Sequence, residues 1–355
     1  MAGTIRAGVV GFGLGGRIFH APFLKAINGL ELAAIMQRHG NEAAEAYPGV
    51  AIVRTLEELL ALPSLDLVVI TTPPSTHFDL ARRALEAGKH VVVDKPFVPT
   101  SKQAAQLIKI AHGRKLVLSA YQNRRWDGDF LTLQKLIEGG ELGRLTSLES
   151  RFERFHPSLR PKQWQEKNVP GNGLVHDLGA HLADQALALF GTPQAITADI
   201  RYDRDRTAVN DGFAIHLHYP RLRVSLYSSL LACVAGPRFV AHGTEGSYIK
   251  FGLDPQEPAL KEGAVLGGPR WGEEPKSAWG KLTKMHKGAA VEKSVPTIAG
   301  DYRKYYENVR DAILGRATLA VPGEQAWRLM RLLELALESS ERRQTIPCHS
   351  LDAIP

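Results

Sequence analysis

Lysine, aspartate and histidine side chains in this sequence have types and spacings suited to moving a proton and stabilising an oxyanion. Lys95 lies in Asp94-Lys95-Pro96, directly after an apolar segment, while Asp177 and His181 are four residues apart. If that segment is helical, Asp177 and His181 share one face. A histidine is the natural proton acceptor near neutral pH, and a lysine can stabilise a developing alkoxide. Taken singly, each residue also has an ordinary explanation, as a surface lysine, a helix cap or a buried histidine.

A glycine-rich turn near the start of the chain indicates which chemistry these residues serve. Gly11, Gly13 and Gly16 have the GxGxxG spacing after an apolar strand-like segment. The first glycine allows a tight turn, the second lets a pyrophosphate approach the backbone, and the third lets helix and strand pack closely. The helix that follows would offer free N–H groups to the phosphates. We therefore predict a dinucleotide site that includes Gly11, Phe12, Gly13, Leu14 and Gly16.

The residues after the second expected strand bear on the choice of dinucleotide. Enzymes that use NAD usually carry a carboxylate there, which binds the ribose hydroxyls. Here the strand ends in Met36-Gln37-Arg38-His39, and Glu31 falls at its opposite end. Arg38, with His39 beside it, could pair with a 2′-phosphate, although a solvated arginine is the alternative. The sequence predicts a preference for NADP, with NAD also possible.

Other polar residues follow strands at the same edge of the expected sheet. Ligands of such sheets bind beyond the carboxyl ends of the strands. We therefore expect the cofactor to contact Thr71, Thr72, Pro73 and His77 after one strand, and Asp94 and Lys95 after another.

The first third of the chain alternates apolar strands with helical segments, which predicts a parallel sheet with right-handed crossovers. A capping box at Thr55–Glu58 opens one helix and Gly88 ends another. The expected strands are Ile5–Val10, Leu32–Met36, Leu67–Thr71, Val91–Asp94 and Leu116–Ala120.

After Tyr121 the pattern changes to strands with few helices. Alternating polar and apolar residues predict a large, mostly antiparallel sheet with one open face. We expect helices over Asp129–Glu138, Tyr302–Leu314 and Glu324–Ser340, and a long loop over 252–300, which is rich in glycine and proline. The expected strands are Leu145–Phe155, Ile196–Tyr202, Phe213–Tyr219, Arg223–Leu230 and Tyr248–Phe251. The fold class is thus α/β. A Rossmann domain covers 1–122 and an α+β domain covers 123–355, with its last helix able to pack back on the first domain.

Composition excludes several other classes of protein. The 355 residues carry a net charge of +7, and most of the charge is scattered, which argues against a nucleic-acid partner. The basic run between Lys276 and Lys293 is interpreted as a solvated loop, and basic residues inside the protein would also attract anionic NADP. Cys233 and Cys348 are the only cysteines and have no metal-ligand spacing, so we expect no metal site and a cytoplasmic protein. We expect no signal peptide and no membrane span.

Longer strings in the sequence resemble the glucose–fructose oxidoreductase / inositol dehydrogenase (Gfo/Idh/MocA) family over nearly the whole chain. The resemblance rests on the glycine turn, on the string from Ala87 to Pro96, and on Asp177-Leu178-Gly179-Ala180-His181. Strings at 19–23, 121–127 and 252–257 are most similar to the branch that holds NADP-dependent scyllo-inositol dehydrogenases.

The resemblance implies a catalytic triad of Lys95, Asp177 and His181. It implies reversible hydride transfer between NADP and a secondary hydroxyl of a cyclic polyol or sugar, without a metal. In this scheme His181 takes the hydroxyl proton, Lys95 holds the oxygen, and Asp177 orients His181 or the substrate. Asn123 is a candidate for both the cofactor and the substrate site, and Arg124 and Trp164 are candidates for the substrate site.

The sequence departs from the family pattern at a few positions. Asp94 replaces the usual glutamate before the lysine, and Arg38-His39 differs in detail from the branch's phosphate-binding residues. His176 stands where the branch commonly has an aromatic residue, which makes it a further substrate-site candidate.

Two alternatives to a dehydrogenase remain open. The family also includes redox-neutral glycosidases that retain NAD and non-catalytic NADP-binding sensors. The presence of Lys95 favours the dehydrogenase, and a sensor would be expected to have lost catalytic residues. Because family members often cover the open sheet face with a partner's sheet, we also expect a homodimer or a dimer of dimers.

Overall fold

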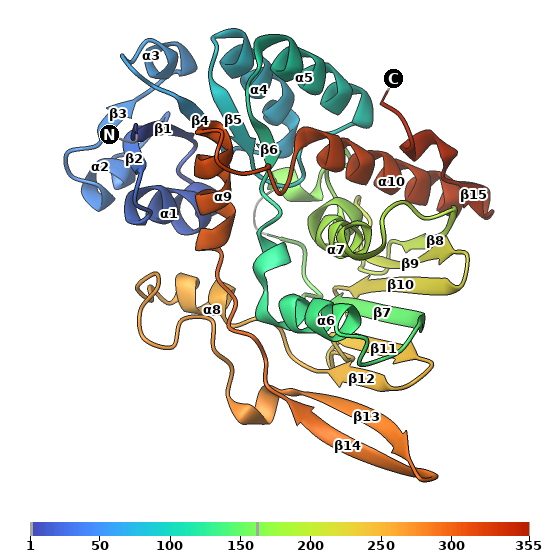
Figure 1. Cartoon of the computed structure of the whole chain (residues 1–355). Helices are drawn as coiled ribbons and strands as arrows, with labels where there is room; N and C mark the ends of the chain where they lie inside the picture. Colours follow the sequence, from blue (N-terminus) through green and yellow to red (C-terminus); the bar gives the residue numbers. More distant parts are fainter. Residues whose placement is uncertain (1–2, 161–162, 355) are drawn as a thin grey trace.

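Residues 3–160 and 163–354 are described by a computed structural model, in which they form two sheets, A and B (Figure 1). Sheet A is parallel, in the order β3-β2-β1-β4-β5-β6, which is the order of a dinucleotide-binding fold. Its strands are β1 Ile5–Val10, β2 Leu30–Met36, β3 Ala51–Val53, β4 Leu67–Ile70, β5 His90–Val93 and β6 Leu118–Ala120.

The strands of sheet A are buried on both faces, which explains why they consist of nearly continuous apolar residues. The Thr55 hydroxyl accepts from the Glu58 N–H at the start of α3, and Gly88, with a φ of 76°, follows the end of α4, so both predicted helix signals are confirmed. The helices of this half are α1 Ala21–Ala26, α2 Glu42–Ala46, α3 Leu56–Leu60, α4 His77–Glu86 and α5 Ser101–Arg114.

Sheet B is mostly antiparallel, with β7 and β10 as a parallel pair in its centre, so the predicted fold class is confirmed. Its strands follow the order β14-β13-β12-β11-β7-β10-β9-β8-β15. They are β7 Leu145–Glu153, β8 Ala195–Arg201, β9 Gly212–Tyr219, β10 Leu222–Ser229, β11 Phe239–Gly243, β12 Ser247–Lys250, β13 Gly280–His286, β14 Ala289–Val295 and β15 Ile346–Pro347.

Alternation along these strands gives sheet B two different faces. Leu148 and Phe152 of β7 and Ile215 of β9 belong to an apolar core that also includes side chains of α6 and α7. Figure 1 shows α6 and α7 on one side of the sheet. The remaining helices are α6 Gly128–Glu138, α7 Ala180–Phe190, α8 Gln256–Lys261, α9 Arg303–Ile313 and α10 Gly323–Arg342.

The prediction of a long loop over 252–300 is wrong, because this segment contains α8 and the hairpin β13–β14. Lys287 and Gly288 both have positive φ, 49° and 80°, as a two-residue type I′ turn requires. The hairpin is largely exposed and projects from the body of the protein in Figure 1, so it lacks the apolar alternation of a half-buried strand.

The C-terminal helix α10 joins the two parts of the chain. Trp327 and Met330 pack into the core of sheet A, whereas Leu329 and Leu333 pack into the core of sheet B. The predicted boundary near residue 122 falls between β6 and the short 3₁₀ helix η3 (Asn123–Trp126) and stays a prediction. Within the described residues, no helix has the length and apolar character needed to cross a membrane.

Candidate active site

A cavity of about 1020 Å³ lies at the carboxyl edge of sheet A and is also lined by residues of the second half of the chain. Most of the residues singled out in the sequence line it, from both halves of the protein. Those residues are Gly11, Phe12, Gly13, Leu14, Arg38, His39, Thr71, Thr72, Pro73, Asp94, Lys95, Asn123, Arg124, Trp164, Asp177 and His181.

The glycine turn has the geometry that a dinucleotide requires. Gly11 has a φ of +102°, and a Cβ on Gly16 would lie 2.2 Å from the Gly11 carbonyl oxygen, so that position packs helix against strand. A Cβ on Gly13 would meet nothing within 4 Å, and this residue faces the cavity. The turn therefore leaves room for a pyrophosphate at Gly13, while Gly16 acts through packing.

The loop after β2 holds Arg38 and His39 at the rim of the cavity. Arg54, after β3, donates hydrogen bonds to the carbonyls of Gln37 (2.9 Å) and Gly40 (2.7 Å) and so fixes the loop. Glu31, at the far end of β2, pairs with Arg6 at 3.3 Å. Because no described carboxylate of this loop lines the cavity, the rim is suited to an additional phosphate.

Asp177 is clamped between two cations. The Lys95 Nζ lies 2.5 Å from Asp177 Oδ1, and Arg160 donates to Oδ2 at 2.9 Å. Burial alone would raise the pKa of Asp177, but the charges of Lys95 and Arg160 lower it below its usual range. Glu166 fixes the loop that carries Arg160, since it accepts from the Arg160 N–H (2.9 Å) and pairs with buried Arg204 (3.0 Å). Asp177 is therefore a fixed carboxylate that directs the Lys95 ammonium group.

His181 lies on the cavity wall with a neutral ring at pH 7. Burial, together with the charges of Lys95 and Arg124, lowers the pKa of His181 well below its usual value. Its Nδ1 is buried and has no hydrogen-bond partner among the described residues. Asp177 lies in the π-helical segment η5 (Val175–Gly179), which continues directly into α7 and His181. A neutral imidazole can accept a proton from a hydroxyl group.

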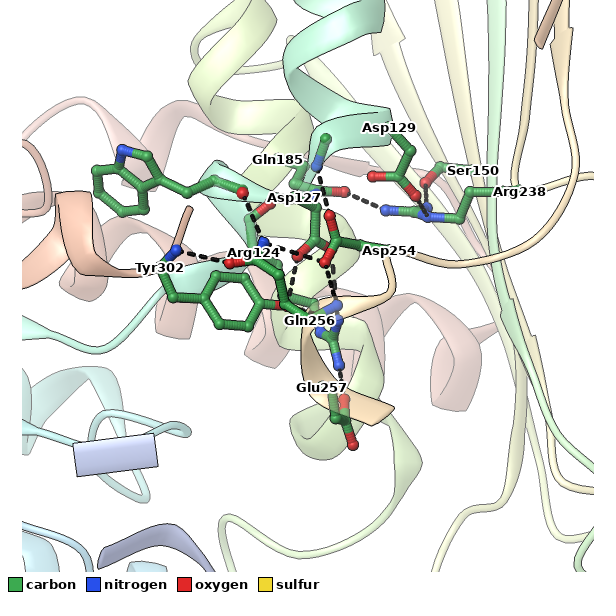
Figure 2. A network of polar contacts seen from close by, with 12 residues as sticks. Arg124, Asp127, Asp129, Ser150, Gln185, Arg238, Asp254, Gln256, Glu257 and Tyr302 are labelled. Carbon is green, nitrogen blue, oxygen red and sulfur yellow. Dashed lines mark hydrogen bonds and ion pairs between the residues drawn. The ribbon is translucent and has the colours of Figure 1, made fainter. Parts of the chain in front are cut away.

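A buried polar network fixes α7, and thereby His181, against the segment that links the two halves (Figure 2). Gln185, one turn beyond His181, donates to the Arg124 carbonyl (2.7 Å) and accepts from Arg238 (2.6 Å). Arg125 forms a bidentate pair with Asp184 at 2.7 and 2.6 Å. The position of the imidazole thus depends on contacts that lie outside the cavity.

Arg124 connects this network to the cavity wall. Its guanidinium pairs with Glu257 on the cavity side and with buried Asp127 at 3.3 Å, and Tyr302 donates to Asp127 at 2.6 Å (Figure 2). Burial on its own would raise the pKa of Glu257, but the charges of Arg124 and Lys261 lower it to about 2. Arg124 and Glu257 therefore present a fixed donor and a fixed acceptor to the cavity.

Several residues that line the cavity were not predicted from the sequence. Arg154, His156 and Arg160 come from the segment after β7, and Glu257 and Lys261 come from α8. Glu257 lies in a string that carried the family resemblance, so it could have been found there. No local motif marks Arg154 or Arg160, because only the fold brings their segment over the cavity.

Two histidines that were predicted to contact ligands do not line the cavity. His77, predicted to contact the cofactor, lies behind the cavity wall, where its ring nitrogens are 2.9 Å from the Pro96 carbonyl oxygen and 2.7 Å from that of Thr72. It joins the turns after β4 and β5. His176, predicted to contact substrate, is buried outside the cavity lining with its Nδ1 3.1 Å from the Asn172 carbonyl oxygen. Neighbouring positions on a helix point in different directions, which separates His176 from Asp177.

Nothing in the described ranges forms a cluster of three or more histidine, cysteine, aspartate or glutamate side chains arranged to hold a metal ion.

The chain matches two family models that together span most of its length. Residues 5–122 match the GFO_IDH_MocA model described as "Oxidoreductase family, NAD-binding Rossmann fold". Residues 134–348 match the model described as "Oxidoreductase family, C-terminal alpha/beta domain".

Individual proteins are similar over nearly their full lengths. The oxidoreductase YdgJ of Escherichia coli is 43% identical over 98% of this chain and 99% of that protein. The scyllo-inositol 2-dehydrogenase (NADP(+)) IolW of Bacillus subtilis is 35% identical over 97% and 96%. Among solved structures, the oxidoreductase yvaA of Bacillus subtilis superposes with a TM-score of 0.95 at 35% identity, covering 98% of this chain and 99% of that chain. An oxidoreductase of Yersinia pestis gives 0.92 at 42% identity, covering 98% of each.

The lowered pKa of His181 predicts how stability changes with pH. The unfolded chain binds a proton on this histidine below about pH 6.5, while the folded chain does not. The folded state therefore becomes less stable as the pH falls. His181→Gln removes the titration. The free energy of unfolding of the variant, measured relative to that of the parent, should therefore be about 1 kcal/mol higher at pH 5.5 than at pH 8.

Urea denaturation at the two pH values measures this difference. A His181→Gln difference that is the same at both pH values would contradict the prediction.

Proposed function

Since the chain belongs to the Gfo/Idh/MocA oxidoreductase family, we propose that it transfers a hydride between NADP(H) and a secondary hydroxyl or ketone of a cyclic polyol or sugar. One observation carries this proposal: Lys95, Asp177 and His181 lie on the wall of the same cavity as the glycine turn. The similarity to IolW, a protein named as an NADP-dependent scyllo-inositol 2-dehydrogenase, supports the choice of cofactor and substrate class. We place the enzyme in the cytoplasm, in agreement with its free cysteines.

The cofactor supplies the hydride acceptor or donor when it is bound. The chain's own residues bind the reacting oxygen and move its proton. Lys95 donates a hydrogen bond to the oxygen and offsets the negative charge that develops there. The neutral His181 takes the hydroxyl proton, and Asp177 keeps the Lys95 ammonium group directed toward the site.

Lys95 and His181 should act in the chemical step rather than in folding. Lys95→Met removes the charge that stabilises the alkoxide, and His181→Asn removes the proton acceptor. We expect each to lower turnover about 100-fold or more, with NADPH binding and melting temperature near those of the parent. A polyol and sugar panel followed at the NADPH absorbance first identifies a substrate for this comparison.

His176→Asn is the matched control, since this buried histidine adjoins Asp177 but does not line the cavity. It should keep turnover within a few-fold of the parent. Full turnover in either Lys95→Met or His181→Asn would refute the assignment, and the absence of turnover with every polyol, sugar and sugar acid would favour a sensor.

Arg38 should determine the preference for NADP. Arg38→Asp removes a charge-assisted contact with the 2′-phosphate and adds repulsion, so the ratio of NAD to NADP dissociation constants should fall at least tenfold. Fluorescence titration with NADPH and NADH measures both constants. Glu31→Gln, at the opposite end of β2, should leave the ratio unchanged. Equal affinities for both cofactors in the unmodified protein would contradict the proposed preference for NADP.

The open face of sheet B suggests a homodimer, or a dimer of dimers. On the central strands the outward side chains include Tyr227, Val240 and Ile249, which are intermediate or exposed. The Arg151 guanidinium stacks at 4.1 Å on the Tyr227 ring, which gives this face a flat, mixed surface. A second copy that packs its own sheet here would cover these side chains.

Light scattering at micromolar concentration should give at least the mass of a dimer. Ile249→Asp places a charge in the expected interface and should shift the protein toward the monomer. Val265→Asp makes the same kind of change at a position that is 79% exposed after α8, and should leave the mass unchanged. A monomer mass for the parent protein would show that the face is not an interface.

A further inference from the structure

Positive charge dominates the part of the cavity where the substrate is expected. Lys95 and the cavity-lining residues after position 122 include five cationic side chains among the described residues, and the carboxylates on this part of the lining are Asp177, Glu257 and Asp94, which adjoins Lys95. Lys95 and Arg160 pair with Asp177, while Arg124 and Lys261 pair with Glu257. Asp177 and Glu257 are each shared by two cations, and Arg124 also pairs with buried Asp127. With Asp94 counted as well, the five cations still exceed the four carboxylates by one charge.

Arg154 is the cation that these carboxylates leave without a partner. It follows β7 and lines the cavity, and none of the described residues forms a hydrogen bond or ion pair with its side chain. Its charge nevertheless reaches the reacting groups. Burial, Lys95 and Arg124 lower the pKa of His181, and Arg154 adds to this effect. Burial raises the pKa of Glu257, and Arg154 adds a smaller contribution to the lowering that Arg124 and Lys261 cause.

We propose that the substrate carries an anionic group, a carboxylate or a phosphate, and that Arg154 binds it. This inference rests on the proposed hydride transfer and specifies its substrate class as a sugar acid or a phosphorylated polyol. A guanidinium on the wall of a partly enclosed cavity binds most strongly to an anion that accepts hydrogen bonds from two of its N–H groups. A neutral polyol would leave this charge and the excess positive potential unbalanced.

An anionic substrate would also improve the acid–base chemistry. A general base works best when its pKa is close to the working pH. The cations around His181 lower its pKa, and a negative charge beside Arg154 would offset part of that effect. The same bound group would therefore add affinity and make the imidazole a stronger base.

Matched pairs of compounds test the charge of the substrate. We would compare kcat/KM for D-glucuronate with D-glucose, and for myo-inositol 1-phosphate with myo-inositol, with the enzyme and NADP at two ionic strengths. The better anionic compound should exceed its neutral partner by about tenfold to a hundredfold, the usual range for one hydrogen bond to a charged group. The ratio should shrink as salt is added.

Arg154→Gln assigns the effect to one residue. It should raise KM for the anion at least tenfold, lower the anion-to-neutral ratio of kcat/KM, and leave the NADPH dissociation constant unchanged. Arg154→Lys should restore part of the loss. Arg114→Gln, at an exposed arginine at the end of α5, is the control and should change none of these values. Calorimetry of myo-inositol 1-phosphate binding to the NADPH-saturated protein gives a readout that does not depend on turnover.

Two outcomes would overturn the proposal. A weaker NADPH affinity in Arg154→Gln, without a change in the anion-to-neutral ratio, would assign Arg154 to the cofactor phosphates. Turnover of the neutral compounds alone, with no effect of Arg154→Gln, would show that the substrate is uncharged while hydride transfer itself stands. If no compound of either kind supports turnover and none binds, the proposed function fails together with this inference.

Discussion

The ion pair between Lys95 and Asp177 is the contact around which the cavity is arranged. It joins the turn after β5 to the helical segment η5–α7, across the space between the two sheets, at 2.5 Å. Its partners are 24% and 27% exposed, so we expect it to contribute about 1 kcal/mol or less to stability. The importance of the pair is therefore positional. It directs the ammonium group of Lys95 from one half of the protein toward the imidazole carried by the other.

Stability at this junction comes instead from contacts behind the cavity. Arg125 and Asp184 are largely buried and form a bidentate pair, and Arg238 pairs with fully buried Asp129 at 3.1 Å. Removing one partner of such a pair typically costs 3–5 kcal/mol, because it leaves a buried charge uncompensated. The cavity side chains are thus held in place by a buried network. They can contact ligands while the stability of the fold depends on other residues.

The ionisable groups also behave differently in the buried network and on the cavity wall. In the buried network, burial and the neighbouring Asp129 raise the pKa of Asp254 to about 6, so this carboxyl group is close to accepting a proton. On the cavity wall, Asp177 and Glu257 are held ionised by cations. Burial, together with these cations, keeps His181 neutral, which links the electrostatics of the wall to one proton transfer.

The sequence by itself determined the parallel sheet, the glycine turn and the types of the reacting residues. These features depend on local patterns: continuous apolar strands, residues that allow positive φ, and a spacing of four between Asp177 and His181. It also placed Arg38 and Glu31 at opposite ends of β2, because a strand has a direction that its residues reveal. The exposed hairpin β13–β14 escaped prediction because neither strand buries a regular apolar face.

Only the tertiary structure decided which side chains share the cavity. His77 and His176 lie close to cavity residues in the sequence, yet backbone direction turns them into the protein interior. Arg154, Arg160 and Glu257 reach the wall from segments distant in the chain, and Arg160 completes the clamp on Asp177. Electrostatic interactions depend on distance in space rather than on separation in sequence. The charge around Lys95 and His181 could therefore be known only once the fold had brought these segments together.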